Sequence, residues 1–298
     1  MGLIEELDGL ETERPMSRQH PLRLGGTADY YMTVADVDSL VTAIATCLRL
    51  KIPYIVLGGG GAVTFSDSGF PGLVIVNQSR GIAWTSDRSQ AVIDAGITLK
   101  EMVLRLASKE LGGLVPFYAK TGSLGAAVYS DERAGIQRLL TSVRYVTVIN
   151  PPDHRRTEAT VSRQPVSWLQ DGQRLREQKV NADSHLNQPV LLSATLQLTS
   201  LRQDELATRI RMAARTSVVV PSGYFDPLWT EGVPLKRLED VAPVGSLRFS
   251  HRFPGLVERQ RGTASSHQLR ELLKIGAAAL SWESEKEARY SSEFLGVW

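Results

Sequence analysis

Apolar residues recur at helical spacing in VADVDSLVTAIATCLRLKI (34–52). This periodicity predicts an amphipathic helix that begins near Asp36 or Asp38, either of which can cap it. A short apolar run follows in PYIVLGG (53–59), and GLVIV (72–76) is a second one. Both runs predict buried strands, and the glycine and proline residues between them predict a turn.

Strand-like and helix-like spacing of apolar residues also follow one another in QAVIDAGITLKEMVLRLASKELGGL (90–114). Its first five residues predict a strand, and Gly96 predicts a turn. The apolar spacing after that turn predicts an amphipathic helix that ends near Gly112.

Two longer apolar segments, SVRYVTVIN (142–150) and PVLLSATLQLTS (189–200), predict strands. The polar stretch between them, 151–188, is expected to be mostly loop. Beyond residue 200 the pattern becomes helical at 202–215, then loop-like, and helical again at 265–280.

These elements place the chain in the α+β class. A chain of 298 residues is too long for one simple core. We expect three units, at 1–78, 79–200 and 201–298.

Four consecutive glycines, Gly58–Gly61, separate two of the predicted strands. Glycine loses more conformational freedom on folding than any other residue, so this run needs a reason. Backbone N–H groups in glycine turns form hollows for anionic oxygens. Small residues also dominate 121–127, so two such loops can clasp a pyrophosphate from both sides. A tight strand connection and close helix packing are the structural alternatives. The run opens no predicted helix and lacks Gly-Lys-Ser/Thr, which argues against a Rossmann fingerprint or a P-loop.

Composition narrows the functional classes. The formal charge is +2 and the basic residues are scattered, which gives no signal for nucleic acid. The one cysteine, Cys47, is expected to be a small buried hydrophobe, and the five dispersed histidines give no metal-site spacing. The acidic N-terminal stretch and the lack of a long apolar run predict no membrane segment or signal peptide, which makes the cytoplasm the expected location.

Five stretches, taken in order, are similar to motifs of one known family. HPLRLGGTADYYMTVADVDSLVTAI resembles its opening strand, Gly-Gly-x-Ala turn and helix, and IPYIVLGGGGAVTFSDSGFPGLVIV its Gly-Gly-Gly-Ser-Asn loop and next strand. AGITLKEMVLRLASKELGGL resembles its Gly-Ala-Gly strand and helix, and TGSLGAAVYSDERAG its Pro-Gly-Thr-Val-Gly-Gly-Ala loop. RGTASSHQLRELLKIGAAAL resembles the Asn-Ala-Thr-Ala turn and helix of its third domain. The family is that of UDP-N-acetylenolpyruvoylglucosamine reductase, also called UDP-N-acetylmuramate dehydrogenase, of bacterial cell-wall synthesis.

The resemblance implies a two-part FAD-binding domain of the reductase and vanillyl-alcohol-oxidase type, with sub-domains at 1–78 and 79–200. It implies a C-terminal α+β substrate-binding domain at 201–298. FAD is then the cofactor, NADPH the co-substrate and a UDP-sugar of peptidoglycan precursor synthesis the substrate, while no protein partner is indicated. The residues expected at the cofactor are Leu57, Gly58, Gly59, Gly60, Gly61, Ala62, Thr121, Gly122, Ser123, Gly125 and Ala126.

The catalytic motifs of the family are not found in register. In VSRQPVSW, Arg163 stands at the arginine of a Tyr-Arg-x-Ser motif, whose tyrosine is replaced. PSGYFDP is three residues shorter than the family's serine loop, and Ser222 is its candidate proton donor. In EARYSSEFLGVW the position of the family's acid holds Ser291, and Glu293 comes two residues later. Two residues along a strand move a side chain by about 7 Å, too far for a proton relay that works at about 3 Å.

The cofactor loops also depart from the family. Gly61 and Ala62 replace Ser-Asn, which leaves the backbone amides but removes two side-chain donors. The segment 129–132 replaces Met-Asn-Ala-Gly and introduces two acidic residues, Asp131 and Glu132. Acidic groups near the phosphates would weaken anion binding.

Three hypotheses remain from the sequence. The first is a working reductase with re-routed catalytic residues, and the second is a catalytically silent relative that keeps the scaffold for binding or regulation. The third is a flavin oxidoreductase with another substrate, which needs a new acid or base. The candidates for that group are Tyr129, Asp131, Tyr224 and His251.

Overall fold

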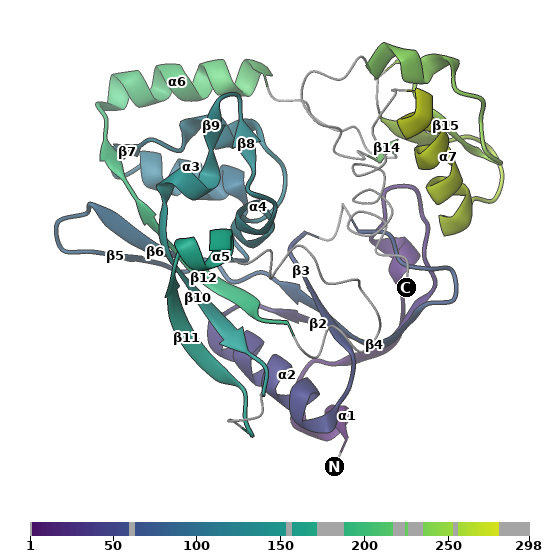
Figure 1. The fold of residues 1–298 in the computed structure, drawn as a ribbon, viewed down its shortest axis with the longest axis horizontal. Coiled ribbons are helices and arrows are strands. Elements are labelled where there is room, and N and C mark those ends of the chain that lie inside the picture. The colour runs from purple at the N-terminus through teal and green to yellow at the C-terminus, as the bar shows by residue number, and fades with distance from the viewer. Residues whose placement is uncertain are drawn as a thin grey trace.

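The computed structural model describes residues 2–59, 63–152, 157–171, 188–216, 224–225, 235–252 and 256–279. Within these ranges the chain forms two larger sheets, each covered by helices, and a smaller group of C-terminal elements (Figure 1). Every helix in the same ranges is too short or too polar to span a bilayer.

The first sheet has the strand order β1-β2-β4-β3. Its strands are β1 (Glu11–Pro15), β2 (Thr27–Val34), β3 (Tyr54–Leu57) and β4 (Phe70–Asn77). Both β2 and β3 pair with β4 in parallel, whereas β1 pairs with β2 antiparallel. The central strand β4 is buried on both faces, which explains the continuous apolar run that predicted it.

Helix α2 (Val37–Leu50) confirms the first helix expected from the sequence. Asp36 is its N-cap, and the carboxylate accepts the N–H of Ser39 at 2.7 Å. Its buried face packs on the first sheet together with the short helix α1 (Leu3–Glu6). Cys47 lies in that core at 0% exposure, and burial raises the pKa of its thiol to about 12. The thiol is therefore a core group, as expected.

The second sheet is antiparallel throughout, with the order β11-β10-β12-β6-β5. Its strands are β5 (Ile82–Trp84), β6 (Gln90–Asp94), β10 (Val143–Asn150), β11 (Thr160–Pro165) and β12 (Val190–Gln197). The elements packed with one face of it are α3 (Leu99–Ala107), the 3-10 helix η2 (Val115–Ala119), α4 (Leu124–Ser130) and α6 (Gln203–Thr216). Two small antiparallel pairs join this group: β7 (Leu111–Gly112) with β13 (Thr199–Ser200), and β8 (Arg133–Ala134) with β9 (Gln137–Arg138). Short 3-10 helices lie at Met16–Arg18 (η1) and Leu139–Ser142 (η3).

Two expected elements were wrong in part. Helix α3 ends at Ala107 rather than near Gly112, because Leu111 and Gly112 pair with β13 as the strand β7. The polar stretch at 151–188 contains the strand β11 and the short helix α5 (Ser167–Asp171) in its described part. β11 lies at the sheet edge and its residues are exposed or half-buried, so its sequence carries no continuous apolar run.

The C-terminal elements pack around a core of their own. They are β14 (Tyr224–Phe225), the 3-10 helix η6 (Leu235–Asp240), β15 (Leu247–Phe249), β16 (Val257–Arg259) and α7 (Ser266–Ala279). Leu22 and Leu24, which lie between η1 and β2, are buried within this core. The C-terminal core is therefore completed by N-terminal residues.

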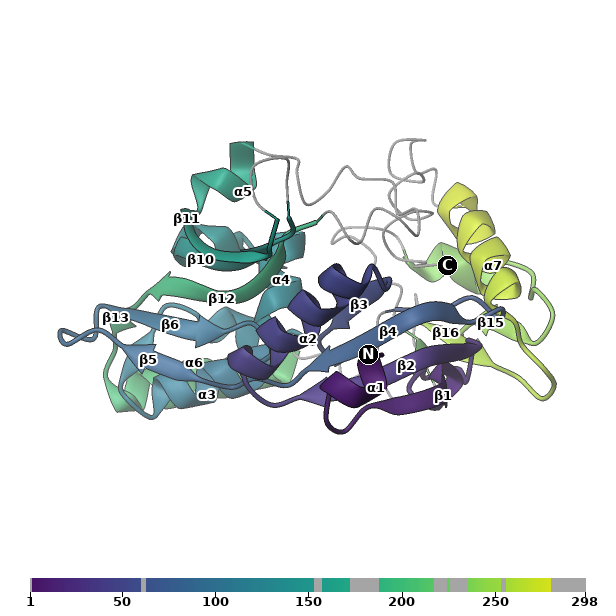
Figure 2. The ribbon, with the colours of Figure 1, turned by 90° about the horizontal axis from the view of Figure 1, so that it is seen from below.

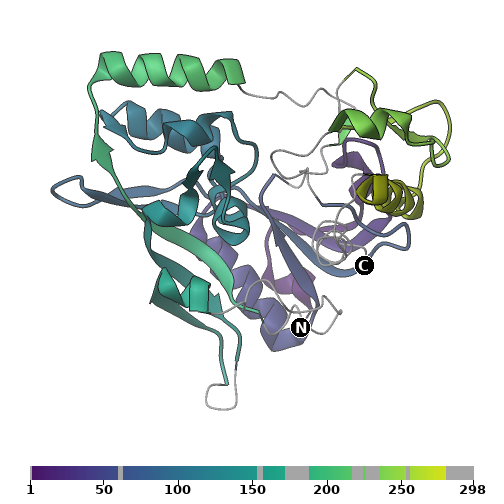
Figure 3. The ribbon, with the colours of Figure 1, turned by 45° about the horizontal axis from the view of Figure 1, so that its top comes forward.

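The two larger sheets share one apolar layer, because Ile149 of β10 and Leu192 of β12 pack into the core that contains α2. Figures 2 and 3 show α3 and α6 at one end of the molecule and α7 at the other. Helix α6 packs with the core of the second sheet, where Leu206 is buried. The unit boundaries expected near 78 and 200 stay predictions.

A buried histidine joins the segment after η1 to the residues that follow the glycine run. His20 is 4% exposed, and its Nε2 lies 2.9 Å from the Oγ1 of Thr64. Its Nδ1 accepts the N–H of Leu22 at 3.2 Å. Because Nδ1 is an acceptor, the ring carries its proton on Nε2 and donates it to Thr64. Burial lowers the pKa of His20 to about 4.

This depressed pKa predicts a pH-dependent loss of stability. Unfolded His20 takes up a proton below about pH 6.5 while the folded ring stays neutral down to about pH 4, so stability falls in that window as the pH falls. We expect the free energy of unfolding of the wild type to fall by roughly 2 kcal/mol between about pH 7 and about pH 5 from this group. Urea titrations of the wild type and His20→Gln should show a smaller fall in the variant.

The exposed His267 of α7 gives the matched control, since His267→Gln should keep the wild-type pH dependence. Equal falls for His20→Gln and the wild type would contradict the role assigned to the buried ring.

Candidate functional site

The first glycine loop and the 121–126 loop meet at a close contact between Gly58 and Ser123. Gly58 follows β3 directly, and a Cβ placed on it would lie 2.8 Å from the Cβ of Ser123 and closer still to its Oγ. Real Cβ contacts are essentially never that short, so only glycine fits at position 58 unless Ser123 moves. The two loops that the sequence singled out therefore lie side by side in the fold.

Backbone hydrogen bonds fix the second loop in place. The N–H of Leu99 donates to the carbonyl of Gly122 at 3.1 Å, and the N–H of Leu124 donates to the carbonyl of Ile97 at 2.8 Å. Gly125 donates to the carbonyl of Ala95 at 2.8 Å, and a Cβ at position 125 would lie 3.0 Å from the Cβ of Ala95. The close packing of α4 on the end of β6 thus explains Gly125.

Several amides of this loop are consumed by the protein itself. The N–H of Ala126 donates to the Oγ of Ser123, the N-cap of α4, at 3.3 Å. The N–H groups of Leu124 and Gly125 are also engaged, as given above. The amides of Thr121, Gly122 and Ser123 have no such bond to the described residues, which leaves them as the donors this loop can offer to a ligand.

Two glycines beside the contact face open space. A Cβ at Gly59 or Gly122 meets no described atom within 4 Å, and Gly122 has a φ of +99°. Backbone without side chains and with space in front of it suits the close approach of a flat or charged ligand. Leu57, at the end of β3, is 5% exposed. Gly60, Gly61 and Ala62 lie outside the described residues, and the assignment of all eleven expected residues to the cofactor stays a prediction.

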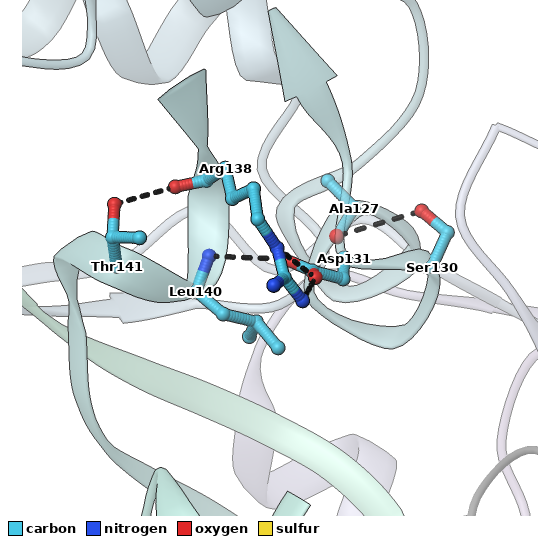
Figure 4. A network of polar contacts seen from close by, with 6 residues as sticks. All are labelled: Ala127, Ser130, Asp131, Arg138, Leu140 and Thr141. Atoms are coloured by element: carbon cyan, nitrogen blue, oxygen red, sulfur yellow. Dashed lines mark hydrogen bonds and ion pairs between the residues drawn. The ribbon is translucent and has the colours of Figure 1, made fainter. Parts of the chain in front are cut away.

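The acidic residues of the 129–132 segment are neutralised locally. Asp131 ends α4 in the left-handed conformation, and its carboxylate pairs with the guanidinium of Arg138, whose Nε lies at 2.6 Å (Figure 4). The other carboxylate oxygen accepts the N–H of Leu140 at 3.4 Å. Glu132 forms an ion pair with the Nζ of Lys120 at 3.2 Å. The length of α4 separates Asp131 from Ser123 by roughly 10 Å, so this acid stands away from the loop contact.

Of the catalytic candidates Arg163, Ser222 and Glu293, only Arg163 lies within the described residues. Arg163 is exposed on β11 opposite Thr147, and its guanidinium stacks on the ring of Tyr145 at 3.9 Å. Val146 and Val148 flank Thr147 and point into the core that contains α4. Because side chains alternate along a strand, Arg163 lies on the opposite face of the sheet.

The remaining catalytic candidates lie partly outside and partly within the described residues. Ser222 and Glu293 lie outside the described residues. Tyr129 is 42% exposed on α4, and His251 is exposed after β15. For Tyr224 the structure gives only the backbone, in β14.

The sequence did not single out the residues that hold the second loop. Ala95 and Ile97 do so through their carbonyl oxygens, and Thr98 forms an isolated bridge with Ser123. In the sequence these three residues were visible only as part of the strand and turn predicted within 90–114. Backbone acceptors carry no side-chain signature, so composition alone could not have found them.

Comparisons with known proteins connect this geometry to a cofactor class. Residues 28–154, which include both loops, match the family described as an FAD binding domain. A UDP-N-acetylenolpyruvoylglucosamine reductase of Chlamydia muridarum is 29% identical over 150 residues, 50% of this chain and 49% of the relative. A reductase of the same name from Treponema denticola is 26% identical over 208 residues, 67% of this chain and 63% of the relative.

One solved structure has a similar fold over the whole chain. It is UDP-N-acetylenolpyruvylglucosamine reductase from Thermus caldophilus, with a TM-score of 0.66 and 18% identity over 97% of this chain and 98% of that one. The sequence matches cover less than this structural match does. The chain spans about half the length of the Chlamydia relative. Together the matches confirm the α+β class, an FAD binding domain over residues 28–154, and FAD as the cofactor.

The contact between the loops predicts a specific pattern of stability. Gly58→Ala places a methyl group against Ser123 and should destabilise the protein by roughly 1–3 kcal/mol in urea unfolding. Adding Ser123→Gly removes the clashing side chain and should restore most of the loss, because glycine is a tolerable N-cap. Gly59→Ala is the control, since its methyl group meets no described atom. A Gly58→Ala protein as stable as the wild type would contradict the contact.

The paired acid predicts a separation of stability from ligand binding. Asp131→Asn weakens a nearly buried carboxylate contact and should cost roughly 1–2 kcal/mol, a modest value because Arg138 is half-exposed. Asp204→Asn, in the exposed pair with Arg202, should leave the unfolding midpoint unchanged. FAD affinity should change less than about twofold in both variants. A marked gain in FAD affinity for Asp131→Asn would show that the acid does act on the site.

Proposed function

The chain is a divergent member of the UDP-N-acetylenolpyruvoylglucosamine reductase family, and on this premise we propose that it is an FAD-dependent, reductase-like protein of peptidoglycan precursor synthesis whose catalytic set is degraded. The observation that carries the proposal is the contact of Gly58 with Ser123 within the FAD-binding domain. We further propose that the protein is cytoplasmic, takes NADPH as its reductant and recognises a UDP-sugar.

The residues around the contact fit the phosphate-bearing middle of FAD. Leu57, Gly58 and Gly59 would present backbone from the end of β3, and Gly122 and Ser123 would present amides from the opposite side. Local pairing of the acids at 131 and 132 removes the two charges that would oppose an anion there. The segment 60–62 and the threonine at 121 complete the proposed set from sequence.

The chemistry that FAD supplies when bound is the transfer of a hydride to the substrate. The protein must then deliver a proton to the neighbouring carbon and stabilise the charge that develops on the substrate. Each of these functions is worth roughly 10²–10⁴ in rate when its residue is removed. Their losses need not add, but a chain without either should retain little reductase activity.

We propose that Arg163 supplies neither the proton nor the stabilisation of the developing charge. Its guanidinium stacks on Tyr145 at an exposed position, on the sheet face opposite the core that contains α4. We therefore propose that Arg163 is a surface residue rather than a substrate contact. Ser222 and Glu293 remain catalytic candidates from the sequence alone.

The visible spectrum of the purified protein tests the proposal. We expect an oxidised-flavin spectrum, or its recovery on adding FAD, and bleaching of that spectrum by NADPH. Adding the enolpyruvyl UDP-sugar should restore the colour at a rate roughly 10²-fold or more below that of an active reductase assayed in parallel. A colourless protein that takes up no FAD would contradict the binding proposal. Recovery at the rate of the active enzyme would contradict the degraded catalytic set.

Gly59→Ala links that spectrum to the proposed loops. The substitution should leave the apoprotein stable, because its methyl group faces open space. If FAD lies against this backbone, the same methyl group should raise the dissociation constant for FAD roughly tenfold or more, measured by quenching of flavin fluorescence. Gly2→Ala, at a terminal position that also faces open space, is the control. An unchanged FAD affinity in Gly59→Ala would remove position 59 from the site.

A further inference from the structure

Helix α7 is capped both by its own residues and by a residue from the first sheet. The N–H of Gln268 donates to the Oγ of Ser265 at 3.1 Å, and the N–H of Ser265 donates to the Oε1 of Gln268 at 3.1 Å. This reciprocal pair is a capping box. The N–H of Ser266 takes no part in this capping box. It donates to both carboxylate oxygens of Asp67, at 3.2 and 3.0 Å.

The contact between Asp67 and Ser266 is reciprocal as well. The Oγ of Ser266 donates to the carboxylate of Asp67 at 3.0 Å, and the N–H of Asp67 donates to the Oγ of Ser266 at 3.3 Å. Ser266 is 4% exposed at this point. The negative carboxylate also lies at the N-terminus of a helix of 14 residues, where the helix dipole favours it.

The turn that carries Asp67 is itself fixed to the first sheet. The carbonyl of Ser66 accepts the N–H groups of Gly26, at 2.8 Å, and of Gly69, at 3.0 Å. A Cβ at Gly26 would lie 2.9 Å from the carbonyl carbon of Asp67, so the two backbones touch. Thr64, three residues before Asp67, is fully buried and bonded to His20. Asp67 is therefore held at a defined position just after the glycine run.

A second attachment of the C-terminal elements uses the same neighbourhood. Leu22 and Leu24 are buried in the C-terminal core, and a guanidinium N–H of Arg259 donates to the carbonyl of Leu22 at 3.3 Å. The segment that carries both leucines begins at His20, which is bonded to Thr64. Both attachments thus pass through backbone that adjoins the glycine run.

We propose that Asp67 is a positioning residue that docks α7, and with it the C-terminal elements, onto the turn after the glycine run. Through this docking, a disturbance at the first turn of α7 reaches the backbone that follows Gly58–Gly61, and the reverse. The consequence for FAD rests on the proposed function: Gly58 and Gly59 are positioned for the cofactor only while α7 is docked.

Hydrogen exchange of the apoprotein tests the docking without any cofactor. Asp67→Ala should speed exchange of the amides at Ser266–Leu269 about tenfold, because a helix cap is lost. Ser266→Ala should speed exchange in the turn at 66–69, on the other side of the contact. Asp67→Asn keeps a side-chain acceptor and should stay close to the wild type.

The matched control is Asp87→Ala, whose native carboxylate accepts the N–H of Ser89 at 3.0 Å within a local turn. It should leave exchange in α7 unchanged. Exchange at wild-type rates in α7 of Asp67→Ala, or in the 66–69 turn of Ser266→Ala, would overturn the docking.

FAD titration tests the link to the glycine run. Asp67→Ala should raise the dissociation constant for FAD roughly threefold or more, and Asp67→Asn should restore it. FAD binding at wild-type affinity by Asp67→Ala, together with faster exchange in α7, would overturn the link. If even the wild type binds no FAD, the proposed function fails, while the exchange rates still decide the docking.

Discussion

The close approach of Gly58 to Ser123 is the constraint on which the proposed site depends. It joins the end of β3 in the first sheet to the start of α4 above the second sheet, and only a residue without a side chain permits it. The carbonyl groups of Ala95 and Ile97 accept hydrogen bonds from the second loop and so fix its position at this contact. Backbone from two separate sheets is thereby brought to one place, with open space in front of the glycines at 59 and 122.

Charge around this place is arranged so that it does not oppose an anion. The acids that replace neutral family residues are each paired, Asp131 with Arg138 and Glu132 with Lys120. In the function that we propose, the chain keeps an FAD-binding domain and has a degraded catalytic set. On this proposal the two parts of the function are separable, because FAD binding would depend on backbone geometry and catalysis on side chains.

Local signals in the sequence were sufficient for elements stabilised locally. Helices α2 and α7 were predicted from their periodicity, and Asp36 was recognised as a possible cap of α2. The strand β11 was missed because it lies at an edge with polar side chains, and its pairing with β10 is a property of the sheet rather than of its own residues. The end of α3 was misplaced for the same reason, since the pairing of β7 with β13 terminates the helix.

In the candidate site too, local features could be predicted from the sequence and tertiary contacts could not. Both small-residue loops could be recognised in the sequence as backbone suited to anions, but their contact is a tertiary fact. The capping of α7 by Asp67 joins residues 199 positions apart, and no local pattern could have revealed it. The role of Gly125 in packing against Ala95 likewise became visible only in the fold.

A crystal structure of the protein grown with FAD would show where the pyrophosphate lies relative to the two loops. We expect the pyrophosphate between the two loops, with its oxygens within hydrogen-bond distance of backbone N–H groups from both 57–62 and 121–123. Density for FAD that contacts one loop only, or that lies away from the Gly58–Ser123 contact, would contradict it.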